Sequence, residues 1–270
     1  MKICFIGGGN MATALIGGLL AQGFKASDFS VVEINADNRT RLTADFGVRC
    51  GSDLVDGING CDTIVLAVKP QQLHEVALLL APLLTGQLLI SIAAGIRASD
   101  LARWANSTAI VRAMPNTPAL IQAGMTGLFA LSNVSPAQRS QAEQILAAVG
   151  KTLWLQDEVM LDSVTAISGS GPAYVFYLIE AMQAAAMELG FNAADARLLS
   201  QETFLGAAKL AIASDDEVAV LRQRVTSKNG TTERALLSLE ANHVKQHIIS
   251  AAHAAAARSA EMGNELGAAT

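Results

Sequence analysis

The chain has 270 residues, 51% of them hydrophobic and only 16% charged, with a formal net charge of −5 at pH 7. This apolar composition excludes a disordered chain, and the lack of any run of Lys or Arg argues against a nucleic-acid partner. We therefore expect a small-molecule partner, and the length allows two unequal domains.

The N-terminus and the cysteines both indicate a cytoplasmic protein. The opening sequence MKICFIGGGNMA has an apolar stretch cut short by three glycines, which is too brief for a signal peptide. The apolar region 76–96 is interrupted by a proline and a Thr-Gly-Gln turn, so we predict no membrane span. The chain has three cysteines, an odd number, and none of them has CxxC spacing: Cys4, Cys50 and Cys61. This pattern is typical of reduced core thiols.

Short β-like runs alternate with helical patterns up to about residue 156. Strands are predicted at 3–6, 30–34, 63–68, 88–92, 109–112, 127–131 and 152–155, and helices at 11–22, 38–46, 71–84 and 136–149. This alternation predicts an α/β domain at residues 1–156, with a mostly parallel sheet covered on both faces.

From residue 157 onward the β-pattern stops and Ala- and Leu-rich helical stretches follow. The first long helix, predicted at 172–189, has apolar side chains on every face and must therefore be buried. In a domain of this size the simplest burial is against a second subunit. We predict an all-helical domain at residues 157–270 that forms a homodimer.

The strongest local motif is a GxGxxA pattern that follows the first strand and opens the first helix. The first glycine of such a turn allows a tight bend, the second lets backbone approach a pyrophosphate, and the small third residue allows close packing. The helix N-terminus then offers free amides to phosphate groups. This context favours a Rossmann-type dinucleotide site, formed here by Ile6, Gly7, Gly8, Gly9, Asn10 and Met11.

The end of the second strand leaves the choice of dinucleotide open. Glu33 follows the glycine motif at the spacing of an acid that accepts the ribose 2′-hydroxyl of NAD. Asn35, Arg39 and Arg41 come directly after it, and a guanidinium there could hold the 2′-phosphate of NADP. Alternatively, both arginines belong to the solvated face of the next helix. We expect NADP(H) as cofactor, with NAD(H) as the second candidate.

Three later segments also follow predicted strands, where ligands of open α/β sheets bind. Small residues in segments 67–70 and 92–95 would let the backbone pass close to the nicotinamide half of a cofactor. The third segment, Met-Pro-Asn-Thr-Pro at 114–118, is stiff and could present its peptide groups to a ligand. The alternative is that all three are plain connections, with a proline beginning a helix. The candidate residues are Ala67, Val68, Lys69, Pro70, Ala93, Ala94 and Asn116.

Two small-residue or hydroxyl-rich segments open helices in the second domain. In 168–174, Ser170 is placed to cap a helix that has Pro172 in its first turn. In 226–232, the amides of Thr231 and Thr232 could bind a carboxylate, and the hydroxyls of Ser227 and Thr232 could bind a ring nitrogen. Taken by itself, the second segment favours an ordinary Asn-Gly turn with a threonine cap.

The sequence offers no support for several other chemistries. The histidine pair at 243 and 247 has helical one-face spacing but no HExxH glutamate and no evident third ligand, so we expect no metal. Neither GxSxG nor GxxxxGK[ST] occurs, which removes the motifs of serine hydrolases and P-loop enzymes.

Together these segments resemble pyrroline-5-carboxylate reductase over nearly the whole chain. The matching stretches are IGGGNMA at 6–12, AVKP at 67–70, AAG at 93–95, RAMPNTPALIQAG at 112–124, VTAISGSGPAYVF at 164–176 and TSKNGTT at 226–232. The resemblance implies reduction of 1-pyrroline-5-carboxylate to L-proline by NADPH, the last step of proline biosynthesis. It also implies a homodimer and, in some members, rings of dimers.

The resemblance further implies that residues 6–11, 67–70, 92–94 and the region near Asn35 contact the cofactor. It implies that Ser227, Gly230, Thr231 and Thr232 bind the substrate, with Ser227 and Thr232 as the catalytic pair. The chain departs from the family pattern in that loop, where Lys228-Asn229 replaces the usual Pro-Gly and Glu233 adds a negative charge that Lys228 could offset.

The residue inventory suits reduction of a cyclic iminium, because a nitrogen that arrives protonated needs no dedicated His or Lys acid. A 3-hydroxyacid dehydrogenase of similar plan would need a general acid or base, usually a Lys on the interdomain helix. Between Asp162 and Glu188 there is no Lys, Arg or His, which argues against that reaction. A non-catalytic NADP-binding regulator that dimerises through its helices is a third hypothesis.

Overall fold

The computed structural model describes residues 1–268, which form two compact units. The first unit contains residues 1–170 together with the C-terminal part of the chain from Ala254, and the second contains Gly171–His253.

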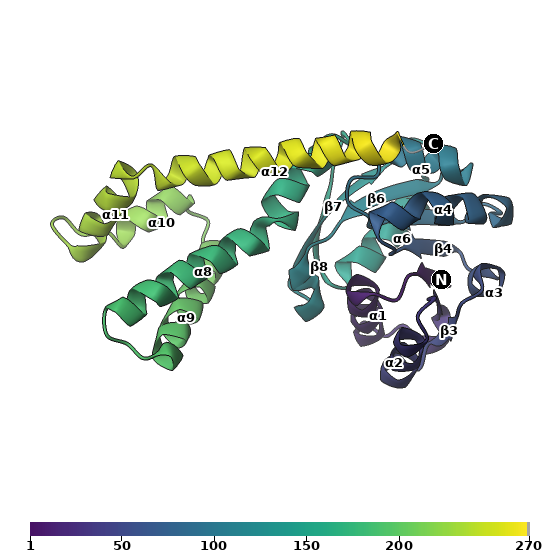
Figure 1. The fold of residues 1–270 in the computed structure, drawn as a ribbon, viewed down its shortest axis with the longest axis horizontal. Helices are drawn as coiled ribbons and strands as arrows, with labels where there is room; N and C mark the ends of the chain where they lie inside the picture. The colour runs from purple at the N-terminus through teal and green to yellow at the C-terminus, as the bar shows by residue number, and fades with distance from the viewer. Residues whose placement is uncertain (269–270) are drawn as a thin grey trace. The chain divides into compact units, whose positions relative to one another are not determined.

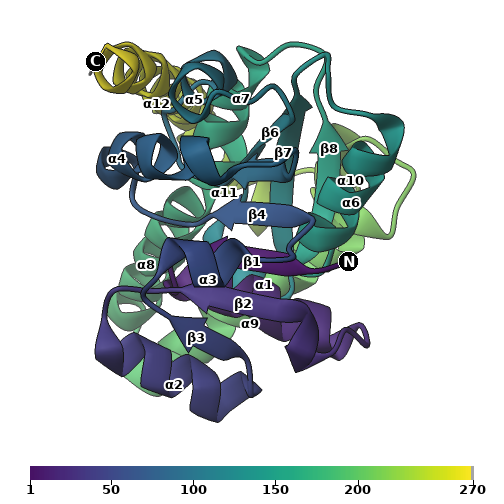
Figure 2. The same cartoon turned by 90° about the vertical axis from the view of Figure 1, so that its right-hand side faces the viewer.

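The first unit is built on one eight-stranded sheet of order β3-β2-β1-β4-β5-β6-β7-β8 (Figures 1 and 2). All neighbouring strands pair in parallel except β6 with β7, which pair antiparallel. The strand order therefore reverses at β1, with β2 on one side and β4 on the other. The strands are β1 Ile3–Ile6, β2 Phe29–Val32, β3 Arg49–Gly51, β4 Thr63–Leu66, β5 Leu88–Ser91, β6 Ile110–Met114, β7 Gly124–Ala130 and β8 Gly150–Trp154.

Helices cover both faces of this sheet, and the alternation of side chains along β1 explains the two cores. Ile3 and Phe5 point into one cluster with side chains of α1, α2 and α6, whereas Cys4 and Ile6 point into the other with side chains of α3, α4 and α5. The helices are α1 Asn10–Ala21, α2 Ala36–Phe46, α3 Leu54–Ile58, α4 Pro70–Leu80, α5 Ala98–Ala105, α6 Pro136–Ala147 and α7 Met160–Val164.

Local sequence accounts for several of these helix starts. The side chain of Ser135 accepts from Gln138 N and that of Gln138 accepts from Ser135 N, and Pro136 occupies the first turn of α6. Asn35 and Asp53 cap α2 and α3 in the same way, each accepting a backbone N–H three residues on. These caps fix the points at which the chain leaves the sheet.

The prediction of a mostly parallel sheet with helices on both faces is confirmed, and seven of the eight strands were expected. The sequence pattern missed β3, α3 and α5. β3 has three residues that are exposed or half-buried, and α3 has five residues, so neither carries enough apolar periodicity to be recognised.

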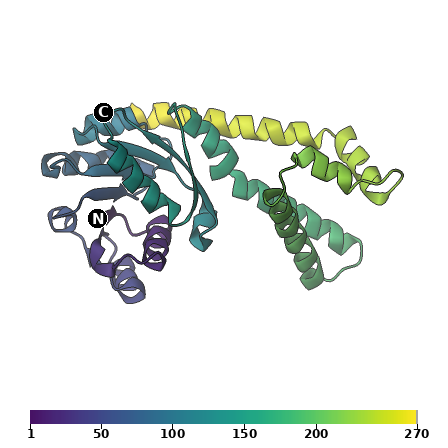
Figure 3. The same cartoon turned by 180° about the vertical axis from the view of Figure 1, so that it is seen from behind.

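The second unit is all helical, as predicted (Figure 3). In this unit α8 packs beside α9, but only Ala196 and Ser200 are buried in the whole of 171–253. Apolar side chains of α8 are largely exposed, including Phe176 at 64% and Tyr177 at 73%. The unit has no apolar core of its own. Its helices are α8 Gly171–Glu188, α9 Ala193–Ile212, α10 Val218–Arg224, α11 Thr231–Ala241 and the first part of α12 Val244–Gly267.

Residues 157–170 and the C-terminal part of α12 belong to the sheet-containing unit, which differs from the division after residue 156 expected from the pattern. Ser259 of α12 donates to Asp162 of α7 at 2.7 Å, which ties the two segments together. The prediction that Ser170 caps a helix is wrong. Ser170 ends the π-helix at Thr165–Gly169 and has helical backbone, whereas an N-cap residue has extended backbone; α8 begins at the next residue, Gly171.

No helix within residues 1–268 combines the length and the apolar character needed to cross a bilayer.

Two adjacent glycines of α1 provide a matched test of this packing. A Cβ on Gly18 would lie 2.4 Å from the carbonyl oxygen of Ala148, whereas a Cβ on Gly17 would meet only the ring of Phe46 at 3.4 Å. Alanine gains about 1 kcal/mol of helix propensity at either position, but overpacking against rigid backbone costs about 1–3 kcal/mol. We expect Gly18→Ala to lower the urea midpoint and Gly17→Ala to keep or raise it. Equal midpoints for the two variants would contradict this packing.

Candidate functional site

The loops after β1 and β4 meet at the point where the strand order reverses. Gly7 has φ +98°, and a Cβ there would lie 2.6 Å from the carbonyl oxygen of Ala67. Its N–H donates to the carbonyl oxygen of Val32 at 2.8 Å, which fixes the turn to the end of β2. Only glycine fits this position, because both the close contact and the left-handed backbone exclude a side chain. Open α/β sheets bind ligands at such a reversal.

The N-terminus of α1 opens directly from this turn. Gly9 has no atom within 4 Å of the position that a Cβ would take, and no side chain caps the first amides of the helix among the described residues. Asn10 and Met11 form the first turn and are exposed or half-buried. Uncapped amides next to a bare glycine turn are what a pyrophosphate requires, so the residues present fit a dinucleotide.

The carboxylate of Glu33 accepts hydrogen bonds from the backbone of the protein. Its Oε2 accepts from Gly8 N and its Oε1 accepts from Asn35 N, each at 2.8 Å. Both carboxylate oxygens are therefore bound to backbone amides of the glycine turn and of the start of α2. This arrangement makes Glu33 a support for the turn.

Arg39 lies at the end of β2 instead of pointing to solvent with the rest of the α2 surface. Its Nη1 donates to the carbonyl oxygens of Glu33 and Ile34, at 2.8 and 2.9 Å. Arg41 is exposed, as a residue of a solvated face would be. A half-buried guanidinium anchored by one nitrogen keeps its other N–H groups for an anion, since guanidinium carries five donors.

The other predicted cofactor residues lie at the carboxyl ends of β4 and β5, on the same edge of the sheet. Ala67 and Val68 are half-buried, and Lys69 is exposed at the N-cap of α4, followed by Pro70 in the first turn. Ala93 is buried and Ala94 half-buried after β5. The parallel strands thus bring the loops after β1, β2, β4 and β5 together, as the pattern predicted.

Asn116 differs from this group because its side chain is occupied by the fold. Its Nδ2 donates to the carbonyl and the hydroxyl oxygen of Ser168, both at 3.1 Å, and its Oδ1 accepts from Met125 N at 2.9 Å. The amide therefore joins the Met-Pro-Asn segment to β7 and to the π-helix. Any contact of this segment with a cofactor is left to its peptide groups.

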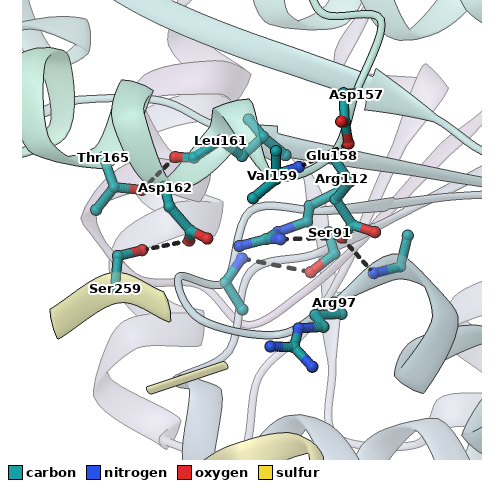
Figure 4. A network of polar contacts seen from close by, with 12 residues as sticks. Ser91, Arg97, Arg112, Asp157, Glu158, Val159, Leu161, Asp162, Thr165 and Ser259 are labelled. Carbon is teal, nitrogen blue, oxygen red and sulfur yellow. Dashed lines mark hydrogen bonds and ion pairs between the residues drawn. The ribbon is translucent and has the colours of Figure 1, made fainter. Parts of the chain in front are cut away.

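A buried ion pair that the sequence did not reveal stabilises the region around β6 (Figure 4). Arg112 Nη1 lies 2.9 Å from Glu158 Oε1, and the same oxygen accepts from Ala98 N at 2.7 Å. The pair joins β6, the start of α5 and the segment before α7. Removing one member of a buried pair typically costs about 3–5 kcal/mol, so the two residues strongly constrain this region. The partners are far apart in sequence, which hides the pair from pattern analysis.

The predicted substrate residues form one turn in the second unit, between α10 and α11. Gly230 N donates to Ser227 O at 3.0 Å, which closes the turn. A Cβ on Gly230 would lie 2.5 Å from Ser227 Oγ, so a side chain at this position would displace the Ser227 hydroxyl. No side chain caps the amides of Thr231 and Thr232 at the start of α11 among the described residues. Such amides can bind a carboxylate.

Glu233 lies in the first turn of α11, and its Oε2 accepts from Asn229 N at 2.6 Å. The carboxylate is therefore bound back onto the turn rather than left free beside the amides. Among the described residues, Lys228 and Glu233 form no ion pair. The negative charge of Glu233 is instead stabilised by the hydrogen bond from the backbone N–H of Asn229.

No group of three or more His, Cys, Asp or Glu side chains in the described part of the chain is arranged to hold a metal ion.

Comparison with known proteins places this architecture among characterised families. A family model described as pyrroline-5-carboxylate reductase dimerisation matches residues 158–262, and one described as NADP oxidoreductase, coenzyme F420-dependent, matches residues 2–95. The pyrroline-5-carboxylate reductase of Pseudomonas aeruginosa is 46% identical over 98% of both chains. That of Haemophilus influenzae is 44% identical over 96% of this chain and 97% of the relative.

Solved structures agree with the sequence relatives. A pyrroline-5-carboxylate reductase from Coxiella burnetii superposes with a TM-score of 0.92 at 41% identity, covering 97% of this chain and 98% of the other. A pyrroline carboxylate reductase from Plasmodium falciparum with NADP bound superposes with a TM-score of 0.87 at 30% identity, with the same coverage.

Proposed function

The chain belongs to the pyrroline-5-carboxylate reductase family, and on this premise we propose how its residues reduce 1-pyrroline-5-carboxylate to L-proline. The enzyme is an oxidoreductase of proline biosynthesis that uses NADP(H). The close approach of Gly7 to Ala67, beside the uncapped start of α1, is the structural observation that carries this function.

We assign the cofactor to the edge of the sheet where the four loops meet. The amides of residues 7–11 hold the pyrophosphate, and residues 67–70 and 93–94 lie along the nicotinamide half. Arg39 and Asn35 hold the 2′-phosphate, because Glu33 is already bound to the turn and Arg39 has free donors. NAD(H) binds in the same place without the phosphate contact, and therefore more weakly.

The turn at 226–232 holds the substrate in this proposal. The amides of Thr231 and Thr232 bind the carboxylate, while the hydroxyls of Ser227 and Thr232 orient the ring nitrogen. NADPH supplies the hydride when bound. Because the iminium nitrogen already carries a proton, the residues need only orient the C=N bond and exclude competing water, which is catalysis by proximity and orientation. No side chain has to donate a proton during hydride transfer.

The two competing hypotheses lose their support. A 3-hydroxyacid dehydrogenase would need a general acid or base on the helices that follow the sheet, and residues 163–187 contain no Lys, Arg or His. A non-catalytic regulator does not fit a chain that matches reductases along its whole length.

The assembly that we propose is a homodimer formed through residues 157–270. Support comes from the second unit, which buries only two residues by itself and exposes apolar side chains along α8. Such a surface needs a partner, and the dimerisation model matches this part of the chain. A ring of dimers is the second candidate assembly. We place the enzyme in the cytoplasm, where reduced thiols and NADPH are available.

Thr232 provides the sharpest test of the substrate site. A hydrogen bond made in the transition state is worth about 1–3 kcal/mol, so Thr232→Ala should lower kcat/KM by roughly 10- to 100-fold. Thr232→Ser keeps the hydroxyl and should retain most of the activity. The measurement is steady-state NADPH oxidation with pyrroline-5-carboxylate. Unchanged kinetics in the alanine variant would remove Thr232 from the mechanism.

Arg39 provides the test of the cofactor assignment. Arg39→Met should raise KM for NADPH roughly tenfold or more, because it removes a charge-assisted contact, and should change KM for NADH much less. Arg41→Met, an exposed arginine of the same helix, is the matched control and should leave both constants unchanged. Equal losses with the two cofactors would show that Arg39 only supports the turn.

A further inference from the structure

Two cysteines lie together at the edge of the sheet opposite to the cofactor loops. Cys4 is near the start of β1 and fully buried, and Cys61 is half-buried just before β4. Both sulfurs lie against Gly57: a Cβ there would be 3.7 Å from Cys4 Sγ, and Cys61 Sγ donates to Gly57 O at 3.6 Å. The fold thus brings together two thiols that are 57 residues apart in sequence.

The Cys61 thiol is accessible from outside the protein. It lines a cavity of about 520 Å³ at the amino ends of β1, β2 and β3, with polar side chains around its mouth. Ser30 Oγ lies 3.6 Å from Cys61 Sγ, and Lys2, Asp28 and Arg49 also line the cavity. A small polar oxidant can therefore reach Cys61, whereas Cys4 lies behind it in the core.

The two thiols differ in their ionisation. The neighbouring Cys4 thiol lowers the pKa of Cys61 to about 6, and Ser30 and the charge of Arg49 act in the same direction, against the opposing effects of burial and of Asp62. The hydrogen bond to Cys61 and burial raise the pKa of Cys4 above its usual range. Of the two thiols, the accessible one therefore has the lower pKa and the larger thiolate fraction at neutral pH.

We propose that Cys61 is a hydroperoxide-reactive thiol and that Cys4 is its resolving partner. The Cys61 thiolate attacks one oxygen of the hydroperoxide, an S–O bond forms, the O–O bond breaks, and hydroxide or alkoxide leaves with the electron pair. Sulfur is oxidised to a sulfenic acid and the peroxide is reduced.

In the second step Cys4 gives up its proton and attacks the Cys61 sulfur. The S–S bond forms, the S–O bond breaks, and the departing hydroxide combines with the proton as water. The product is an internal disulfide between β1 and the loop before β4. This goes beyond the expectation that all three cysteines are reduced core thiols, which remains our assignment for Cys50, whose Sγ lies 3.8 Å from Val48 O.

The experiment exposes the full-length protein to hydrogen peroxide at neutral pH and follows each cysteine by peptide mass spectrometry, with dimedone to trap sulfenic acid. We expect a Cys4–Cys61 cross-linked peptide that dithiothreitol reverses. Cys4→Ala should stop at a dimedone adduct on Cys61, and Cys61→Ser should form neither product. Cys50→Ser is the matched control and should behave as the unmodified chain does.

A second measurement is independent of the cross-link. At pH 6 iodoacetamide should alkylate Cys61 roughly tenfold faster than an ordinary thiol, since the larger thiolate fraction outweighs the lower intrinsic nucleophilicity. Faster alkylation or oxidation of Cys50 than of Cys61 would overturn the proposal. So would a stable sulfenic acid on Cys61 in the unmodified chain with no disulfide to Cys4.

Discussion

The close approach of two backbones, Gly7 against the carbonyl of Ala67, is the constraint on which the cofactor site depends. It exists because β1 is paired with β2 on one side and β4 on the other, so the loops after β1 and β4 meet. A side chain at residue 7 would force them apart. Without one, the chain turns directly into α1 and leaves the first helix amides free for phosphate oxygens.

Polar side chains then stabilise this edge of the sheet. Glu33 ties the glycine turn to the start of α2 through two backbone amides, and Arg39 fixes the end of β2. In the same unit, the Arg112–Glu158 ion pair joins β6 to the start of α5. An acidic residue at the spacing of an NAD-binding acid is thus a structural element here, and we propose that the neighbouring arginine selects the phosphate-bearing cofactor.

The sequence predicted the parts of the fold that local rules control. Strand and helix alternation, the glycine turn and the all-helical second part follow from periodicity and from the steric needs of single residues. It did not predict β3 or α3, whose few residues carry no periodicity. It also did not predict the hydrogen bonds of the Glu33 and Asn116 side chains to backbone amides, or the Arg112–Glu158 ion pair. Each of these interactions depends on partners that only the folded chain brings together.

Direct hydride transfer to a protonated imine is the chemical step that we assign to this protein. The most direct test uses NADPH deuterated at nicotinamide C4, on either face in turn, with pyrroline-5-carboxylate as substrate, and locates deuterium in the product by NMR. We expect L-proline with deuterium at the former C=N carbon from one of the two labelled cofactors and unlabelled L-proline from the other. Deuterium at any other carbon, or no deuterium from either cofactor, would rule out direct hydride transfer.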